Sequence, residues 1–271
     1  MGSQLLKKIH KKINYDIYST FFKNSCMDKK ISYIYLDVNN FKKKDLINYS
    51  KKIDNLIILS WCALNDYNSS EHKKFSQNLL KFSKLILSYS NISLINVLGS
   101  CLEYGIVEGK INENYNPRPI TNYGKYKLYY LTELMKLKSI YKFKFNWMRI
   151  FYMYGDVRNR GIWSQFLKAK KENKTFKMSY GQQKFDFINI NKLINYLIVI
   201  IFSNRSLGII NICSGRPTKL ISLVKNWSVK HNVKLQIGYY PYTKYESMSY
   251  WGSNDKLNRI LNSYEKSNKK V

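Results

Sequence analysis

Apolar runs of strand length alternate along this chain with longer stretches in which apolar residues recur at helical spacing. Residues 54–61 and 92–98 are mostly apolar runs, which is typical of strands buried on both faces of a parallel sheet. Residues 71–88 place their apolar side chains on one face of a helix, which predicts an amphipathic helix. The alternation predicts an α/β fold. Further strands are expected over residues 15–22, 31–38, 145–154 and 208–215, and further helices over residues 46–53, 123–137, 161–171, 191–202 and 220–231.

One stretch combines the end of a strand, a loop and the start of a helix. The apolar run ends at Ser100, and residues 116–119 read Asn-Pro-Arg-Pro, which marks a loop. Tyr123 and Lys127 follow four residues apart, so both lie along one helix face. A free tyrosine has a pKa of about 10, and a nearby ammonium lowers that pKa by stabilising the phenolate. With Ser100 to hold a substrate oxygen, the stretch predicts a proton-transfer site.

The chain of 271 residues is strongly basic, with 46 lysine and arginine residues against 17 aspartate and glutamate residues and a formal net charge of +29. Such a charge can indicate a nucleic-acid or anionic-membrane partner. The lysines are scattered over the whole length, however, and form neither a basic tail nor a basic amphipathic helix. Because lysine, asparagine, isoleucine and tyrosine are abundant together, we attribute the charge to AT-rich codon usage and rank a nucleic-acid partner second.

The cysteines, histidines and apolar runs argue against secreted, metal-binding and membrane proteins. The four cysteines are far apart and form no Cys-x-x-Cys pair, so they predict buried thiols in a reducing compartment. The three histidines lack the spacing of metal ligands, and we expect no metal. The most apolar run, residues 193–202, is too short to cross a bilayer, and no signal peptide is visible. We therefore expect a cytoplasmic protein without a membrane partner.

The residues around Tyr123 and Lys127 decide between two explanations of the pair. On spacing alone, a solvated helix face is the simpler explanation, because the chain holds 24 tyrosines and many lysines. Residues 100–105 read SCLEYG, residues 117–119 read PRP and residues 123–127 read YGKYK. In order and spacing these segments resemble the active-site stretch of the extended short-chain dehydrogenase/reductases. That family comprises nucleotide-sugar epimerases, dehydratases and reductases.

The resemblance extends over nearly the whole chain and implies a doubly wound, Rossmann-like parallel sheet that binds NAD or NADP. It implies a dinucleotide-binding domain at residues 1–155 and a small lobe for a nucleotide sugar at residues 156–271, with residues 182–215 returning to the sheet. The implied reaction is hydride transfer between the nicotinamide and a sugar carbon, usually C4. Ser100 would bind the C4 oxygen, Tyr123 would exchange the proton, and Lys127 would hold the nicotinamide ribose.

The resemblance implies four cofactor-binding residues: Gly2, Asp37, Ser60 and Lys127. Asp37 ends an expected strand at the place where family members hydrogen-bond the adenine, although a strand-end Asp by itself is more often a turn residue. An acid at the end of the preceding strand favours NAD, and a basic residue there favours NADP. Ser19, Thr20 and Lys23 occupy that region and no acid does. These residues slightly favour NADP over NAD.

Gly2 matches the last glycine of the family's Gly-x-x-Gly-x-x-Gly turn, and the first strand and first two glycines are absent from the sequence as it stands. Those glycines let the backbone approach the cofactor pyrophosphate at a helix N-terminus. We expect a true start upstream of Met1, because the Ser-Tyr-Lys set is intact. A remnant that no longer binds cofactor is the alternative.

Three further residues are implied to bind the sugar nucleotide: Glu103, Arg149 and Tyr152. The family usually has Asn where this chain has Tyr152, which indicates a variant sugar pocket. Dehydratases of the family place Asp-Glu directly after the catalytic hydroxyl residue, whereas this chain has Cys101 and Leu102. Glu103 follows one residue later, and on an extended segment it would face the opposite side. We therefore expect an epimerase or a 4-ketoreductase, and we favour the reductase because the tyrosine-rich residues 239–254 resemble the segment that covers the sugar nucleotide in some reductases.

Two rival functions stay open. The first is a relative that binds a ligand without catalysis, which a nicotinamide fluorescence titration would separate from an enzyme. The second is a basic nucleic-acid-binding protein, in which the tyrosines and lysines of residues 239–254 would stack on single-stranded bases. A homodimer is compatible with the resemblance and is also left open.

Overall fold

The structure is a computed structural model, and it describes residues 2–9, 16–21, 31–155, 161–242 and 247–268. Lys23 lies outside the described residues. The chain forms two compact units. The first unit comprises Met1–Leu98, Thr121–Trp147 and Leu197–Gly208, and the second unit comprises Gly99–Ile120, Met148–Tyr196 and Ile209–Val271. The division of the chain at residue 155 into a cofactor domain and a substrate lobe stays a prediction.

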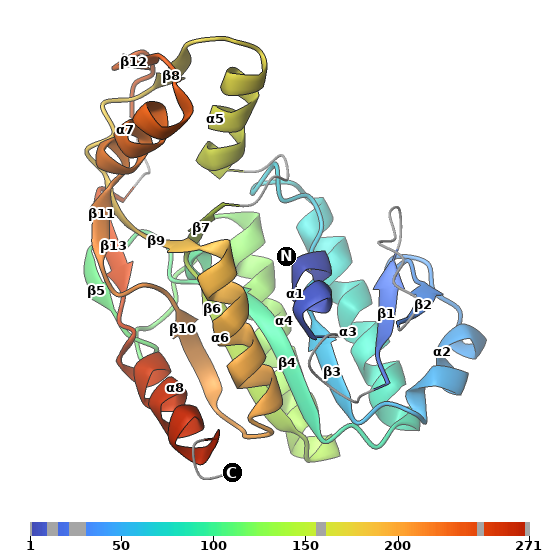
Figure 1. The fold of residues 1–271 in the computed structure, drawn as a ribbon. Coiled ribbons are helices and arrows are strands. Elements are labelled where there is room, and N and C mark those ends of the chain that lie inside the picture. The colour runs from blue at the N-terminus through green and yellow to red at the C-terminus, as the bar shows by residue number, and fades with distance from the viewer. Residues whose placement is uncertain (1, 10–15, 22–30, 156–160, 243–246, 269–271) are drawn as a thin grey trace. The chain divides into compact units, whose positions relative to one another are not determined.

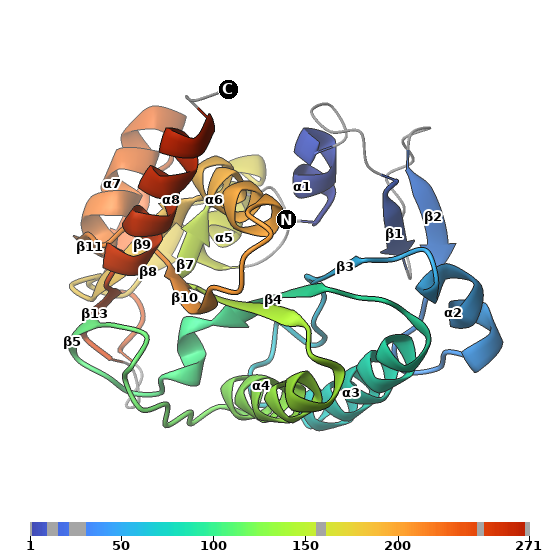
Figure 2. The ribbon, with the colours of Figure 1, turned by 90° about the horizontal axis from the view of Figure 1, so that it is seen from below.

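The first unit consists of parallel strands and the helices that cover them. Its elements are α1 (Gly2–Ile9), β1 (Tyr18–Phe21), β2 (Ser32–Tyr35), α2 (Lys43–Ser50), β3 (Asn55–Ile58), α3 (Glu71–Tyr89), α4 (Asn122–Tyr141) and the greater part of β4 (Leu94–Ser100) and β6 (Lys144–Ile150). β1 pairs in parallel with β2, and β3 pairs in parallel with β4, which lies between β3 and β6. Figure 2 shows α3 and α4 side by side beneath β3 and β4, with α1 on the other side.

Burial explains why these segments adopt this arrangement. All seven residues of β4 are buried, as expected for a strand covered on both faces. The inward face of α3 buries Leu79, Phe82 and Ile86, which recur at helical spacing.

A row of three asparagines, of which Asn96 and Asn146 are buried, fixes the register of β3, β4 and β6. The Asn96 amide donates to the Asn55 side-chain oxygen at 3.1 Å, and the Asn146 amide donates to the Asn96 side-chain oxygen at 2.9 Å. The Asn146 side-chain oxygen in turn accepts the backbone N–H of Leu207 at 2.7 Å. Because a buried amide without a partner costs free energy, a shift of one strand against its neighbour would be unfavourable.

The second unit is built around short strands that come from distant parts of the chain (Figure 1). Its elements are the 3-10 helix Cys101–Glu103, β5 (Gly109–Ile111), β7 (Tyr152–Tyr154), α5 (Gly161–Lys171), β8 (Phe176–Met178), β9 (Lys184–Asn189), the first part of α6 (Ile190–Phe202), β10 (Gly208–Ile212), β11 (Pro217–Lys219), α7 (Leu220–His231), β12 (Leu235–Ile237), β13 (Ser249–Gly252) and α8 (Asp255–Asn268). The main sheet has the order β11-β9-β13-β5, and β7 also pairs with β9. β8 and β12 form a separate parallel pair.

A small aromatic core holds α5 and α7 against β8. Phe166 is fully buried, and its ring centroid lies 5.4 Å from that of Phe176 and 5.7 Å from that of Trp227. Trp163 packs edge to face on Trp227 at 4.7 Å. Edge-to-face aromatic pairs of this kind stabilise a core beyond the burial of their area.

The α/β fold with parallel sheets that the sequence predicts is confirmed. The strand expected over residues 145–154 is instead two strands, because β6 lies between β4 and β10 whereas β7 pairs with β9 in another sheet. The strand expected over residues 15–22 is described as β1, and both ends of the expected range lie outside the described residues. The other expected strands and helices appear with shifts of a few residues at their ends.

Candidate active site

Tyr123 and Lys127 both lie at the start of α4, in the first unit. The side-chain oxygen of Thr121 caps this helix by accepting the backbone N–H of Gly124 at 3.2 Å. The backbone N–H of Tyr123 donates to the carbonyl of Tyr67 at 2.8 Å. These bonds satisfy N–H groups that the first helical turn leaves without intrahelical partners. The backbone of Tyr123 is therefore fixed by its own cap and by the loop that follows β3.

Lys127 is buried beside Tyr123, with 3% of its surface exposed. Its Nζ donates a hydrogen bond to the carbonyl of Leu98 and lies 4.2 Å from the centroid of the Trp61 ring and 5.9 Å from that of the Tyr123 ring. An ammonium taken out of water needs other groups to stabilise its charge, and carbonyl oxygens and aromatic faces do so. The structure thus brings the predicted tyrosine–lysine pair together.

Ser100 ends β4 in the second unit and starts a tight turn. Its Oγ accepts the backbone N–H of Leu102 at 3.2 Å, and its own backbone N–H donates to Glu103 Oε1 at 2.8 Å. This reciprocal arrangement is a capping box. The expectation of an extended segment after Ser100 is therefore wrong: residues 101–103 form a 3-10 helix, because the two side chains satisfy its first N–H groups.

Glu103 and Arg149 form an ion pair inside the second unit, with Arg149 Nε 2.8 Å from Glu103 Oε2 and side-chain exposures of 1% and 0%. Burial opposes the charge of Arg149, but Glu103 and the side-chain oxygen of Tyr104 raise the pKa of Arg149 above its usual value. The guanidinium carbon of Arg149 also lies 4.4 Å from the centroid of the Tyr104 ring. Burial raises the pKa of Tyr104 to about 12, so its neutral hydroxyl donates to Asn211 at 2.7 Å. The pair supports the Ser100 turn. A role of either residue in binding substrate stays a prediction.

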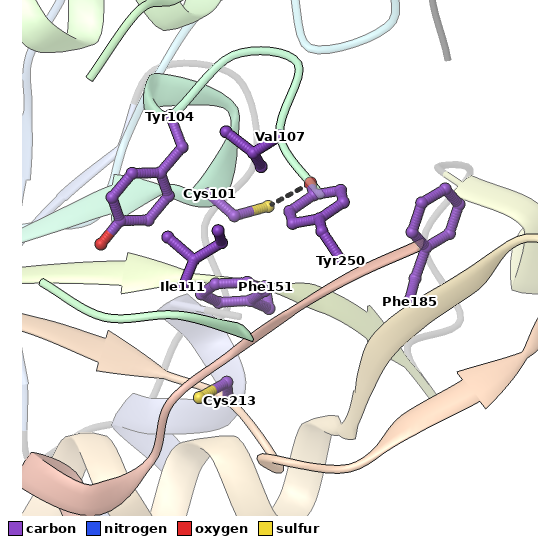
Figure 3. Close-up of a cluster of buried hydrophobic side chains, with 8 residues drawn as sticks. All are labelled: Cys101, Tyr104, Val107, Ile111, Phe151, Phe185, Cys213 and Tyr250. Carbon is purple, nitrogen blue, oxygen red and sulfur yellow. Dashed lines mark hydrogen bonds between the residues drawn. The ribbon is translucent and has the colours of Figure 1, made fainter. Parts of the chain in front are cut away.

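Tyr152, the third residue implied to bind substrate, is half-buried in an aromatic cluster of the second unit. Its ring centroid lies 4.8 Å from that of Phe185, and its hydroxyl lies 3.2 Å from the Tyr250 hydroxyl. The Tyr250 hydroxyl also lies 3.4 Å from Cys101 Sγ. Figure 3 marks this contact with a dashed line. Burial raises the pKa of Cys101 to about 12 and that of Tyr250 well above its usual value. The residue after Ser100 is therefore a neutral thiol in apolar surroundings.

The other implied cofactor-binding residues lie at the edge where a dinucleotide is expected in such a fold. Gly2 is the first residue of α1, Asp37 follows β2 and Ser60 follows β3. Ligands of parallel α/β sheets bind beyond the carboxyl ends of the strands, near helix N-termini. Asp37 also fixes a turn, because its Oδ1 accepts the backbone N–H of Asn39 at 2.8 Å. The residues present fit a dinucleotide, and their individual contacts with it stay predictions.

The candidate catalytic residues are divided between the two units. Tyr123 and Lys127 belong to the first unit, and Ser100 belongs to the second. The structure describes the residues of each unit separately. The meeting of Ser100 with Tyr123 at one substrate oxygen stays a prediction.

Trp61 and His72 both contact the tyrosine–lysine pair and were not predicted from the sequence. The Trp61 indole donates to His72 Nδ1 at 3.2 Å, and the His72 ring centroid lies 5.5 Å from that of Tyr123. A signal was present in the helical period, because His72 shares the inward face of α3 with Phe75 and Leu79. A histidine on an apolar helix face is buried and needs polar partners.

Within the described part of the chain, no group of His, Cys, Asp and Glu side chains could hold a metal ion. Among the helices that the structure describes, none combines the length and apolar character needed to cross a membrane.

Comparisons with known proteins identify the family of this chain. The sequence profile of the NAD dependent epimerase/dehydratase family matches residues 1–213. The chain is 30% identical over 219 residues to a dTDP-6-deoxy-L-talose 4-dehydrogenase (NAD(+)) of Aggregatibacter actinomycetemcomitans, and the match covers 78% of each chain.

Solved structures of two nucleotide-sugar epimerases are similar in fold. The UDP-glucuronic acid 4-epimerase of Bacillus cereus, in complex with UDP-glucuronic acid and NAD, is 16% identical with a TM-score of 0.81 over 96% of this chain and 89% of its own. The UDP-N-acetylglucosamine 4-epimerase of Methanobrevibacter ruminantium M1, in complex with UDP-N-acetylmuramic acid, is 16% identical with a TM-score of 0.80 over 96% of this chain and 87% of its own. The profile match and the curated relative together show that this chain is an enzyme of the NAD dependent epimerase/dehydratase family.

Proposed function

We propose that this enzyme is a nucleotide-sugar 4-ketoreductase, which reduces the C4 ketone of a nucleotide-linked 6-deoxyhexose or runs the reverse oxidation. The observation that carries the proposal is the buried Lys127 ammonium held beside Tyr123 at the start of α4. The substrate class follows the 4-dehydrogenase of a dTDP-6-deoxy sugar that is 30% identical to this chain. An epimerase at C4 is the second candidate, because the two similar structures named above are 4-epimerases.

Three side chains would handle the proton and the reacting oxygen. In the reducing direction, the Tyr123 hydroxyl gives its proton to the C4 oxygen as the C4 carbon gains a hydride, so the ketone becomes a secondary alcohol. Lys127 stabilises the phenolate that remains, and Ser100 holds the oxygen through a hydrogen bond. In the oxidising direction the same phenolate takes the proton. The nicotinamide, when bound, supplies or accepts the hydride.

The surroundings of Cys101 support a reductase or epimerase over a dehydratase. Elimination of water across C5 and C6 needs its own acid and base next to the catalytic hydroxyl residue. Cys101 is buried, its pKa is raised to about 12, and its Sγ accepts from the Tyr250 hydroxyl. Leu102 has no acid–base group at all. Neither side chain can replace the Asp-Glu pair of the dehydratases.

A panel of nucleotide sugars tests the proposal. The enzyme is incubated with reduced nicotinamide cofactor and the dTDP- and UDP-linked forms of a 4-keto-6-deoxyhexose, and in parallel with intact dTDP- and UDP-hexoses. We expect the nicotinamide absorbance to fall with a 4-keto sugar, with a C4 alcohol as product.

Each other outcome of the panel has a distinct meaning. Inversion at C4 of an intact hexose without net change in the nicotinamide would favour the epimerase. A 4-keto-6-deoxy product from an intact hexose would contradict both candidates. The Tyr123→Phe variant controls for reduction that does not depend on the proposed site.

We also expect NADP to bind about as well as NAD, within roughly tenfold in Kd. The described residues of β1, Tyr18–Phe21, include Ser19 and Thr20 and no acid that would repel the 2′-phosphate. Fluorescence titration of the protein with each reduced cofactor measures both constants under one condition. Binding of NADPH more than about a hundredfold weaker than that of NADH would contradict this expectation.

A further inference from the structure

The ring of Tyr123 is surrounded by the loop that follows β3 and by the start of α3. Its centroid lies 5.3 Å from that of Tyr67, 5.5 Å from that of His72 and 6.1 Å from that of Trp61. All four residues belong to the first unit. The carbonyl of Tyr67 also accepts the backbone N–H of Tyr123. The loop therefore contacts both the side chain and the backbone of the proposed proton donor.

The hydrogen bonds of His72 define its protonation. The ring is fully buried, its Nδ1 lies 3.2 Å from the Trp61 indole nitrogen, and its Nε2 lies 2.9 Å from the carbonyl oxygen of Asp66. An indole N–H can only donate and a carbonyl oxygen can only accept. Nδ1 must therefore be the acceptor, and Nε2 must carry the hydrogen. His72 is a neutral imidazole with one tautomer, and this tautomer fixes the orientation of the Trp61 ring.

Of the cation–π contacts described for the Lys127 ammonium, the contact with the Trp61 ring is the shortest. Lys127 Nζ lies 4.2 Å from the Trp61 ring centroid, compared with 5.9 Å for Tyr123 and 6.0 Å for Trp147. Cation–π attraction acts within about 6 Å, is strongest for tryptophan and grows when the pair is removed from water. Lys127 is only 3% exposed, so the contact is shielded from solvent.

We propose that Trp61 and His72 are positioning residues, in which His72 orients the Trp61 ring and Trp61 holds the Lys127 ammonium beside Tyr123. The inference rests on the proposed role of Tyr123 as the proton-exchanging group. This positioning would act on the reaction through electrostatics. Without the indole face the ammonium has more freedom to move, the Tyr123 phenolate is less stabilised, and Tyr123 titrates at higher pH. A merely structural role of Trp61 would lower stability without moving that titration.

Five variants separate these roles. Trp61→Leu removes the ring, and Trp61→Phe keeps a ring face without the N–H. His72→Gln keeps one acceptor and one donor, whereas His72→Leu keeps neither. Tyr89→Leu is the matched control, because it removes another cation–π contact, in which Lys43 Nζ lies 4.9 Å from the Tyr89 ring at the opposite end of α3.

The first readout is turnover. We expect Trp61→Leu to lower kcat about tenfold and Trp61→Phe to lower it less. His72→Gln should retain more activity than His72→Leu, because the amide preserves the bond to the indole. Tyr89→Leu should match the unmodified enzyme. Equal kcat values for Trp61→Leu and the Tyr89→Leu control would overturn the proposal.

The second readout does not depend on turnover. Tyrosine is labelled at the ring carbon that bears the hydroxyl, and the Tyr123 signal is assigned by its loss in Tyr123→Phe. We expect its NMR titration to move up by about one pH unit in Trp61→Leu and to stay unchanged in Tyr89→Leu. An unchanged Tyr123 titration in Trp61→Leu would overturn the proposal. If no nucleotide sugar is turned over while this shift is observed, the proposed function fails and the positioning of the pair stands.

Discussion

Replacing Tyr123 with phenylalanine is expected to lower turnover by about 10²- to 10⁴-fold, the range typical for the loss of a general acid–base group. The substitution removes the hydroxyl that is proposed to exchange a proton with the C4 oxygen and keeps the ring. The ring contacts with Trp61, Tyr67 and His72 remain available, so the fold should be retained. Steady-state kinetics with a 4-keto sugar measures the loss, and thermal unfolding verifies that the variant is folded.

A second tyrosine of the same helix provides the control for this experiment. Tyr129 lies on α4 with 37% of its surface exposed, so Tyr129→Phe makes the same chemical change away from the proposed site. We expect its turnover to equal that of the unmodified enzyme. Near-native turnover in Tyr123→Phe would mean that another group exchanges the proton.

Lys127→Ala should weaken cofactor binding as well as turnover, because it removes the group expected to hold the nicotinamide ribose.

Replacing Glu103 with glutamine is expected to lower the free energy of unfolding by about 3–5 kcal/mol. The Arg149 guanidinium is 1% exposed and would lose the carboxylate 2.8 Å away, leaving a buried charge without a counter-charge. Glu103 also accepts the backbone N–H of Ser100, so the turn that presents the serine should loosen as well. Urea unfolding followed by circular dichroism measures the change.

The double variant Glu103→Gln with Arg149→Met decides whether the ion pair causes this loss. It removes both charges, and burying two neutral groups avoids the penalty of an isolated ion. We expect it to regain a large part of the stability lost in Glu103→Gln. A double variant that is as unstable as the sum of both single variants would contradict the account, since the two side chains would then act independently.

The segments that could be predicted are those whose own periodicity specifies burial. The α3 and α4 helices and the β4 strand follow from local patterns, because each helix has one apolar face and the strand is mostly apolar. The strands β9, β11 and β13 could not be predicted, since each has three to six residues and pairs with a distant segment. Helix α8 was also missed, although Leu257 and Ile260 lie on its buried side.

In the candidate site, too, the features that depend on neighbouring residues could be predicted, and those that depend on distant residues could not. The four-residue spacing of Tyr123 and Lys127 is a local signal, and the helix start that it requires is in the structure. The role of Trp61 could not be read from the sequence, because its contact with Lys127 depends on how the loop after β3 packs against α4. Glu103 and Arg149 were predicted to bind substrate from resemblance alone. Their burial is a property of the folded second unit.

Direct transfer of a hydride between the nicotinamide and C4 of a nucleotide sugar is the step that defines the proposed reaction. Reduced cofactor that carries deuterium at the transferring position is incubated with the enzyme and a nucleotide 4-keto-6-deoxyhexose, and the product is analysed by NMR and mass spectrometry. We expect one deuterium in the product, bonded to C4 of the sugar, and no labelled product from Tyr123→Phe over the same time. Deuterium retained in the cofactor, or found at another carbon of the sugar, would contradict the proposed reaction.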